Sequence, residues 1–124
     1  MTKRILVVED QEDLRGVLRD LFTSSGYTVI EAPDGATGIA IAKADRPSII
    51  LMDIQMPVVD GYEATRQINA DPELTSIPIV AVSSFAMKGD EEKARAAGCD
   101  EYVTKPYSSI QLLRMVRGYL GDKA

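Results

Sequence analysis

Acidic side chains directly follow two apolar runs of the sequence. Residues 48–52 lead into Asp53, and residues 5–8 lead into Glu9 and Asp10. A carboxylate at the tip of a strand is ionised and can act as a nucleophile or as a metal ligand. If both runs are neighbouring strands of one sheet, the three carboxylates meet at one end of it. Because Mg²⁺ prefers carboxylate, carbonyl and water oxygens, this arrangement predicts a divalent-cation site beside a potential nucleophile.

Two further polar residues follow other apolar runs. Ser83 comes after residues 77–82, and its hydroxyl can donate a hydrogen bond to a phosphoryl oxygen. Lys105 precedes Pro106, where an ammonium group can offer a point charge to phosphate and where the peptide bond can be cis, which would direct the side chain inward. Singly, each of these polar residues also fits a turn, a helix cap or a solvated surface. Their coincidence at predicted strand ends favours a phosphate site.

Apolar runs alternate with segments of helical periodicity along the whole chain. Short apolar runs predict strands at residues 5–8, 27–30, 49–52, 77–82 and 102–103. Helical spacing and end signals predict helices at residues 11–25, 36–44, 60–71 and 88–97, and from 108 onward. Ser108 and Gln111 fit a capping box at the start of the last helix, which carries Ile110, Leu113 and Val116. This alternation indicates an α/β fold, a doubly wound parallel sheet of five strands with five helices on its two faces.

Ligands of such sheets bind at the carboxyl ends of the strands, near the point where the strand order reverses. The polar residues that fall at or just past these predicted ends are Glu9, Asp10, Asp53, Ser83 and Lys105. We therefore expect them to form one site.

Bulk composition excludes several classes of function. With 124 residues the chain fits one domain of about 100–200 residues. No apolar run approaches the ~20 residues of a membrane span, and Met1 leads into a strand rather than a signal peptide, so we expect a cytoplasmic protein. A net charge of −5 argues against direct nucleic-acid binding. Without histidine, and with Cys99 as the only cysteine, the chain offers no histidine base, disulfide or multi-thiolate zinc site.

These residues and their spacing resemble bacterial response-regulator receiver domains over almost the whole chain. The matching parts are the Glu9-Asp10 pair, residues 53–61, Ser83 and the Lys105-Pro106 pair. Residues 85–90 are also similar to stand-alone receivers of bacterial cell-cycle phosphorelays. The resemblance implies the flavodoxin-like strand order 2-1-3-4-5, which chemotaxis receivers share, and a single receiver domain over residues 1–124 with no output domain.

The resemblance also implies roles for the site residues. Asp53 would attack the phosphorus of a phosphohistidine on a sensor histidine kinase or a histidine phosphotransferase and become an acyl phosphate. Lys105 and Ser83 would contact the phosphoryl oxygens. The implied metal is Mg²⁺ (or Mn²⁺), held by Glu9, Asp10, Asp53 and the backbone carbonyl of Gln55.

Tyr102 matches the switch aromatic of the family. When Ser83 moves toward the phosphoryl group, Tyr102 would turn into the vacated space and change the surface offered to a downstream protein target. Tyr102 fits equally well as a half-buried strand aromatic.

Gln55 and Phe85 lie where the family tunes the lifetime of the acyl phosphate. We expect a monomer or weak dimer that binds neither nucleic acid nor membrane directly.

Two other functions use a similar fold. A phosphohydrolase of the haloacid-dehalogenase type also attacks phosphate with a strand-end aspartate, but it needs a second acid two residues later, where this chain has Gln55. A nucleotide- or flavin-binding module would have a glycine-rich loop after the first strand, where this chain has acids. We therefore expect a phosphoryl-accepting switch rather than an enzyme, with only self-directed phosphoryl transfer and autodephosphorylation.

Overall fold

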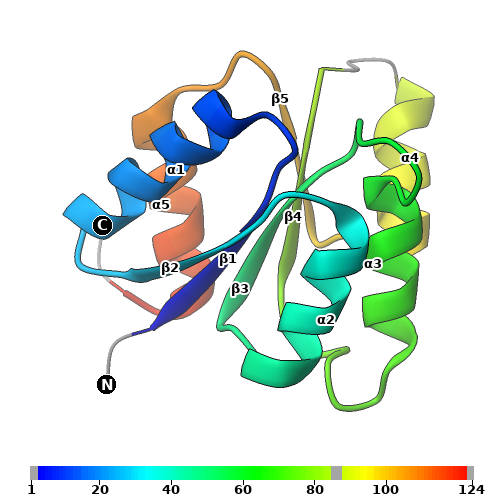
Figure 1. The fold of residues 1–124 in the computed structure, drawn as a ribbon. Coiled ribbons are helices and arrows are strands. Elements are labelled where there is room, and N and C mark those ends of the chain that lie inside the picture. Colours follow the sequence, from blue (N-terminus) through cyan, green and yellow to red (C-terminus); the bar gives the residue numbers. More distant parts are fainter. Residues whose placement is uncertain (1–2, 85–87, 123–124) are drawn as a thin grey trace.

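A computed structural model describes residues 3–84 and 88–122, which form a parallel sheet between two layers of helices (Figure 1). The strands are β1 (Arg4–Val8), β2 (Thr28–Ala32), β3 (Ile49–Asp53), β4 (Ile79–Ser83) and β5 (Glu101–Thr104). All four pairings are parallel, and the strand order is β2-β1-β3-β4-β5. The predicted fold class and strand order are therefore confirmed.

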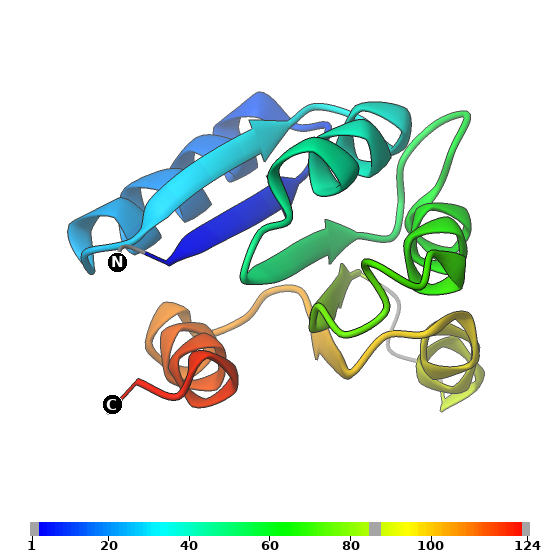
Figure 2. The same cartoon turned by 90° about the horizontal axis from the view of Figure 1, so that it is seen from below.

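The helices cover both faces of the sheet. They are α1 (Glu12–Ser24), α2 (Gly35–Asp45), α3 (Gly61–Ala70), α4 (Lys88–Ala97) and α5 (Ser109–Leu120). Helices α1 and α5 lie on one face, and α2, α3 and α4 lie on the other (Figures 1 and 2). A strand covered on both faces needs apolar side chains in both directions, which is why β1, β3 and β4 are continuous apolar runs.

Alternate residues of the central strands enter two separate cores. Leu6 and Met52 belong to the core under α2, α3 and α4, whereas Val7 and Leu51 belong to the core under α1 and α5. These four side chains are at most 1% exposed. Burying each of them stabilises the fold by about 2 kcal/mol. The ends of β1 and β3 are therefore firmly held relative to each other.

Two predicted strand starts are wrong because turns precede the strands. Tyr27 belongs to the turn after α1, where its backbone N–H bonds to the carbonyl of Phe22. Ile77 likewise donates its N–H to the carbonyl of Leu74, so β4 begins only at Ile79. Both β2 and β4 extend beyond the predicted ends, to Ala32 and Ser83.

Of the three apolar residues that mark the last helix in the sequence, only Val116 is buried. Ile110 is 64% exposed, and Leu112 and Val116 are the buried residues of α5. Leu113 is half-buried at the edge of the core under α1 and α5. The predicted cap at Ser108 is confirmed, since its hydroxyl accepts from the N–H of Gln111 at 3.3 Å.

Within residues 3–84 and 88–122, no helix is both long and apolar enough to cross a lipid bilayer.

Candidate functional site

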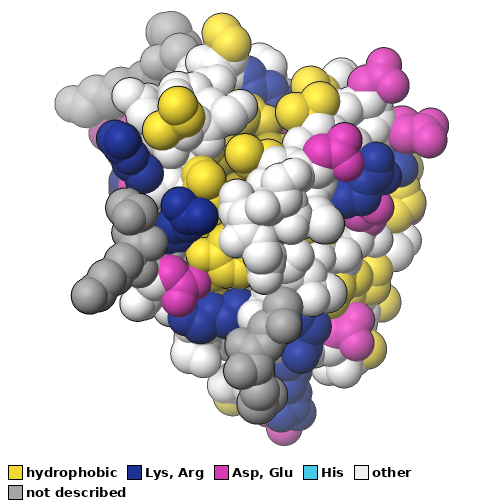
Figure 3. All heavy atoms as spheres, turned by 90° about the vertical axis from the view of Figure 1, so that its left-hand side faces the viewer, with side chains coloured by type: hydrophobic (Ala, Val, Ile, Leu, Met, Phe, Trp, Pro, Cys, Tyr) yellow, Lys and Arg dark blue, Asp and Glu magenta, His cyan; other side chains and the backbone are white. Residues whose placement is uncertain are grey.

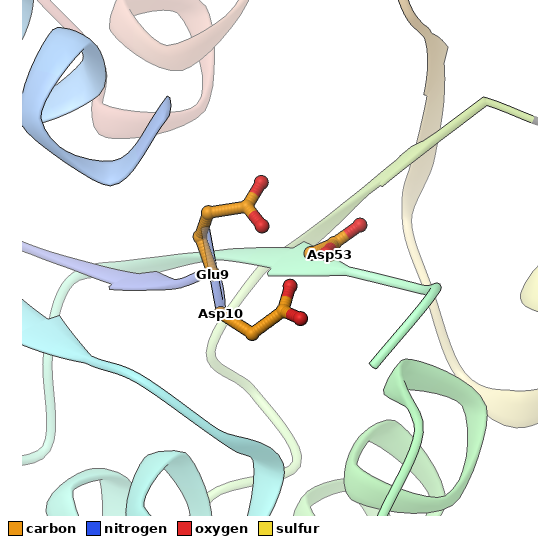
Figure 4. A group of neighbouring side chains, drawn as sticks. All are labelled: Glu9, Asp10 and Asp53. Atoms are coloured by element: carbon orange, nitrogen blue, oxygen red, sulfur yellow. The ribbon is translucent and has the colours of Figure 1, made fainter. Parts of the chain in front are cut away.

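Three carboxylates lie at the carboxyl ends of two adjacent strands. Glu9 and Asp10 follow β1, and Asp53 is the last residue of β3. Val8 pairs with Met52 in the sheet, so the residues that follow them are neighbours. One oxygen atom from each of the three carboxylates lies within 4.8 Å of the others. The three side chains lie together at this edge, as Figure 4 shows, in the arrangement that the sequence predicts.

A lysine offsets part of the negative charge of this cluster. Glu9 and Asp53 are each only 3% exposed, and Asp10 is more accessible. The Nζ atom of Lys105 lies 3.3 Å from Oε1 of Glu9 and 3.3 Å from Oδ1 of Asp53. Lys105 reaches the acids from the loop after β5, and its peptide bond to Pro106 is cis, as the sequence allowed. Because a buried charge is costly without a partner, the lysine stabilises this cluster.

The pKa values of Asp53 and Lys105 are shifted by burial and by the neighbouring charges. Burial, followed by a hydrogen bond with Glu9 and its charge, raises the pKa of Asp53 from 3.8 to about 7, although Lys105 opposes the rise. Burial lowers the pKa of Lys105, but the charges of Asp53 and Glu9 outweigh it and raise the pKa. A further cation would favour the ionised form of Asp53. The donor atoms are all oxygen, which fits a hard divalent cation such as Mg²⁺ or Mn²⁺.

Ser83 lies beside the acids at the end of β4 and is fully buried. The side-chain amide of Gln55 donates to its hydroxyl oxygen at 2.6 Å and accepts from the backbone N–H of Ser84 at 3.0 Å. The N–H of Lys105 bonds to the carbonyl of Ser83 at 2.7 Å. The end of β4 is thus tied to the loops that follow both β3 and β5. Gln55 was predicted to offer its backbone carbonyl to a metal, whereas this contact of its side chain with Ser83 was not predicted.

Tyr102 lies on β5, which β4 separates from the strand that ends in Asp53. It pairs with Ala81 of β4, is half-buried, and packs against the core under α2, α3 and α4. This position is compatible with both predicted roles, the switch and the strand aromatic. Phe85, which was considered for the lifetime of an acyl phosphate, lies outside the described residues.

Gly61 allows α3 to begin directly against the end of β3. Its N–H bonds to the carbonyl of Ile54 at 3.0 Å. A Cβ atom at this position would lie 2.3 Å from the carbonyl oxygen of Asp53 and 2.6 Å from the Cα atom of Ile54. Both are backbone atoms, so a side chain at position 61 would push the chain next to Asp53 out of place.

We expect Gly61→Ala to lower the free energy of unfolding by about 2 kcal/mol, as overpacking does. Urea denaturation measures this change. Gly118→Ala is the matched control, because Gly118 lies within α5 and a Cβ atom there meets no atom within 4 Å. The control should be as stable as the wild type or more stable, since alanine favours helix by about 1 kcal/mol over glycine. Equal stability of Gly61→Ala and wild type would contradict the proposed steric limit.

Most of the chain is similar to one known protein family. The family model described as the response regulator receiver domain matches residues 5–117. A relative named polar-differentiation response regulator DivK, from Brucella ovis, is 44% identical over 122 residues, which cover 98% of this chain and 99% of that protein. The DivK of Brucella abortus strain 2308 gives the same values.

Solved structures show the same similarity. The receiver domain of the sensor histidine kinase PA1611 from Pseudomonas aeruginosa, which has a magnesium ion coordinated in its active site cleft, is 35% identical with a TM-score of 0.90. The alignment covers 98% of this chain and 100% of that one. The chemotaxis protein CheY4 of Vibrio cholerae shares the fold, with a TM-score of 0.91, 24% identity, and 97% of this chain and 100% of that one covered.

Proposed function

Since this chain belongs to the response regulator receiver domain family, it is a signalling module of the two-component and phosphorelay type, and we propose that Asp53 is its phosphoryl acceptor. One observation supports this assignment above the others. Asp53 lies at the sheet edge where two more acids and the ammonium group of Lys105 converge, with Lys105 3.3 Å away. An anionic nucleophile beside a metal-binding acid pair and a phosphate-binding cation is what phosphoryl transfer requires.

Glu9, Asp10, Asp53 and the backbone carbonyl of Gln55 would hold Mg²⁺ or Mn²⁺. When bound, the ion offsets the repulsion between the negatively charged acids and the negatively charged phosphoryl group. An oxygen of the ionised Asp53 attacks the phosphorus of a phosphohistidine, and the P–N bond breaks with its electron pair left on the imidazole. Lys105 then transfers its hydrogen bonds from the carboxylates to a phosphoryl oxygen. Ser83 donates its hydroxyl hydrogen to another.

The donor would be a sensor histidine kinase or a histidine phosphotransferase. A hollow of about 430 Å³ opens beside Lys105 and is lined by Leu14, Val17, Ser84, Lys105, Pro106, Tyr107 and Ser109. Val17 is 55% exposed there. Figure 3 shows apolar side chains between charged ones on this side of the molecule, which carries α1 and α5. An apolar surface next to the acceptor is where a donor protein would bind to bring its histidine to Asp53.

The proposal is tested by incubating the protein with Mg²⁺ and acetyl phosphate. We expect wild type to gain one phosphoryl group per chain, measured by intact-protein mass spectrometry, and Asp53→Asn to gain none. Asp45→Asn, which changes an exposed carboxylate on α2, is the matched control and should be labelled like wild type. Labelling of Asp53→Asn at the wild-type level would refute Asp53 as acceptor. Continuous hydrolysis of many phosphate esters would favour the phosphohydrolase instead.

Tyr102 would report the phosphorylated state to a downstream protein. We expect Tyr102→Ala to accept a phosphoryl group at nearly the wild-type rate, because the ring belongs to β5 and not to the acid cluster. Proteins that wild type retains from a lysate only with beryllofluoride, a phosphoryl analogue, should be lost from this variant. Retention of the same proteins by Tyr102→Ala would show that Tyr102 is a strand aromatic without a switching role.

We further propose that the protein acts in the cytoplasm, as a monomer or weak dimer, and transmits its signal through protein contacts rather than by binding nucleic acid. Its DivK relatives are named for polar differentiation, so a cell-polarity or cell-cycle pathway is the first place to search for its partners.

A further inference from the structure

Arg15 connects the end of β1 to the neighbouring strand β2. From the first half of α1, its Nη1 group donates to the backbone carbonyl of Glu9 at 2.9 Å. Its Nε group donates to the carboxylate of Glu31 at 3.2 Å. The side chain of Arg15 is only 16% exposed. Neither Arg15 nor Glu31 is among the residues proposed to bind the metal or the phosphoryl group.

With the contact to Arg15, the backbone N–H, the backbone carbonyl and the side-chain carboxylate of Glu9 each have a hydrogen-bond partner. The N–H of Glu9 bonds to the carbonyl of Ala32 at 3.0 Å. Its carboxylate accepts from the N–H of Gln11 at 3.2 Å and pairs with Lys105. Arg15 takes the carbonyl oxygen, which is the remaining polar group. That carbonyl belongs to the peptide unit between Glu9 and Asp10. The orientation of this peptide unit therefore sets the direction in which the Asp10 side chain leaves the backbone.

We propose that Arg15, braced by Glu31, is a positioning residue that orients the Glu9–Asp10 peptide so that both acids face Asp53. This inference rests on the metal-binding role proposed for those acids. Groups that orient metal ligands without touching the metal commonly change its affinity about 10–100-fold when they are removed. A guanidinium group suits the task because its planar fork can bond to a carbonyl and a carboxylate at once.

Charge alone predicts the opposite effect of removing Arg15. A positive charge near a cation site repels the cation, so its loss would strengthen Mg²⁺ binding if the arginine acted only through its field. If Arg15 positions the acids, its loss weakens binding. The sign of the change therefore separates the two explanations.

Arg19 provides a matched control on the same helix. It lies one turn further along α1 and pairs with the other carboxylate oxygen of Glu31 at 3.5 Å and with Asp20 at 3.3 Å. Its side chain is 48% exposed. Arg19→Met thus removes an equal charge and a partner of Glu31 while the contact between Arg15 and Glu9 stays in place.

The experiment measures the dissociation constant of Mg²⁺, and of Mn²⁺ as a second probe, by isothermal titration calorimetry on the unphosphorylated protein. We expect Arg15→Met to raise the dissociation constant about tenfold or more. Arg15→Lys retains the charge but lacks the fork, and should also bind more weakly than wild type. Glu31→Gln should cause a smaller loss, and Arg19→Met should stay within about twofold of wild type.

Each outcome decides between the alternatives. Unchanged or tighter Mg²⁺ binding by Arg15→Met would overturn the proposal, as would an equal loss in Arg19→Met. If Arg15→Met does not fold, as judged by circular dichroism, Arg15→Lys and Glu31→Gln decide, and wild-type affinity in both would overturn it. Failure of the wild type to bind Mg²⁺ or Mn²⁺ would instead refute the metal site proposed above.

Discussion

Replacing Lys105 with methionine is expected to slow phosphoryl acceptance from acetyl phosphate by about 10²–10³-fold, the usual effect of losing one preorganised donor to a developing anion. Methionine retains an unbranched apolar stem but cannot donate to a phosphoryl oxygen. Only Lys105 is within 4.0 Å of the Asp53 carboxylate among the ion pairs of the described residues. The rate of incorporation of labelled phosphate at saturating Mg²⁺ measures the effect.

Mg²⁺ binding by Lys105→Met gives an independent check. The lysine ammonium lies 3.3 Å from Glu9 and from Asp53, so its positive charge competes with a divalent cation for the same oxygens. We expect the variant to bind Mg²⁺ more tightly than wild type while accepting phosphate more slowly. Lys43→Met, which alters an exposed lysine of α2, should change neither property. Acceptance by Lys105→Met at the wild-type rate would contradict the role of Lys105 in contacting the phosphoryl group.

Asp53→Asn is expected to be more stable than wild type when no divalent cation is present at pH 8. The reason is the raised pKa of Asp53, which is about 7 in the folded protein against 3.8 for the free group. Each pKa unit corresponds to about 1.4 kcal/mol, so ionising Asp53 costs the folded state up to about 4 kcal/mol. Asparagine has nearly the same shape and no charge to bury, so the variant avoids this cost.

The pH dependence follows from the same pKa. Below about pH 4 the carboxyl group is protonated in both states, and the folded wild type carries no penalty. Between pH 4 and 7 the unfolded chain loses this proton first, so the stability contributed by protonated Asp53 declines and is lost as the pH rises through about 7. The difference in unfolding free energy between Asp53→Asn and wild type should therefore grow from pH 4 to 8.

Urea denaturation in EDTA at pH 4, 6 and 8 tests this expectation. Adding Mg²⁺ at pH 8 should stabilise wild type more than Asp53→Asn, because the metal offsets the charge that the variant lacks. The exposed control Asp45→Asn should remain within about 0.5 kcal/mol of wild type throughout. If Asp53→Asn were less stable than wild type at pH 8 in EDTA, ionised Asp53 would not destabilise the folded protein, and the expectation would be refuted.

Local pattern was enough to predict the elements and the edge at which the site forms. The continuous apolar runs before Glu9 and Asp53 indicate strands covered on both faces, and carboxyl ends of parallel strands always share one edge of a sheet. Helix ends with a strong chemical signal, such as the cap at Ser108, were likewise predictable. The starts of β2 and β4 were not, because Tyr27 and Ile77 are suited to strands but their N–H groups bond within turns.

The sequence by itself determined which chemical groups are present: acids and a hydroxyl at strand ends, a lysine before a proline, and no histidine. Only the tertiary structure decided how these groups act on one another. The bond from the amide of Gln55 to Ser83 joins residues 28 positions apart, and Lys105 meets Glu9 from 96 positions away. Such contacts depend on how loops from separate strands close over the sheet edge. Burial, which raises the pKa of Asp53, is likewise a property of the packed molecule, since in an extended chain every one of these side chains would be hydrated.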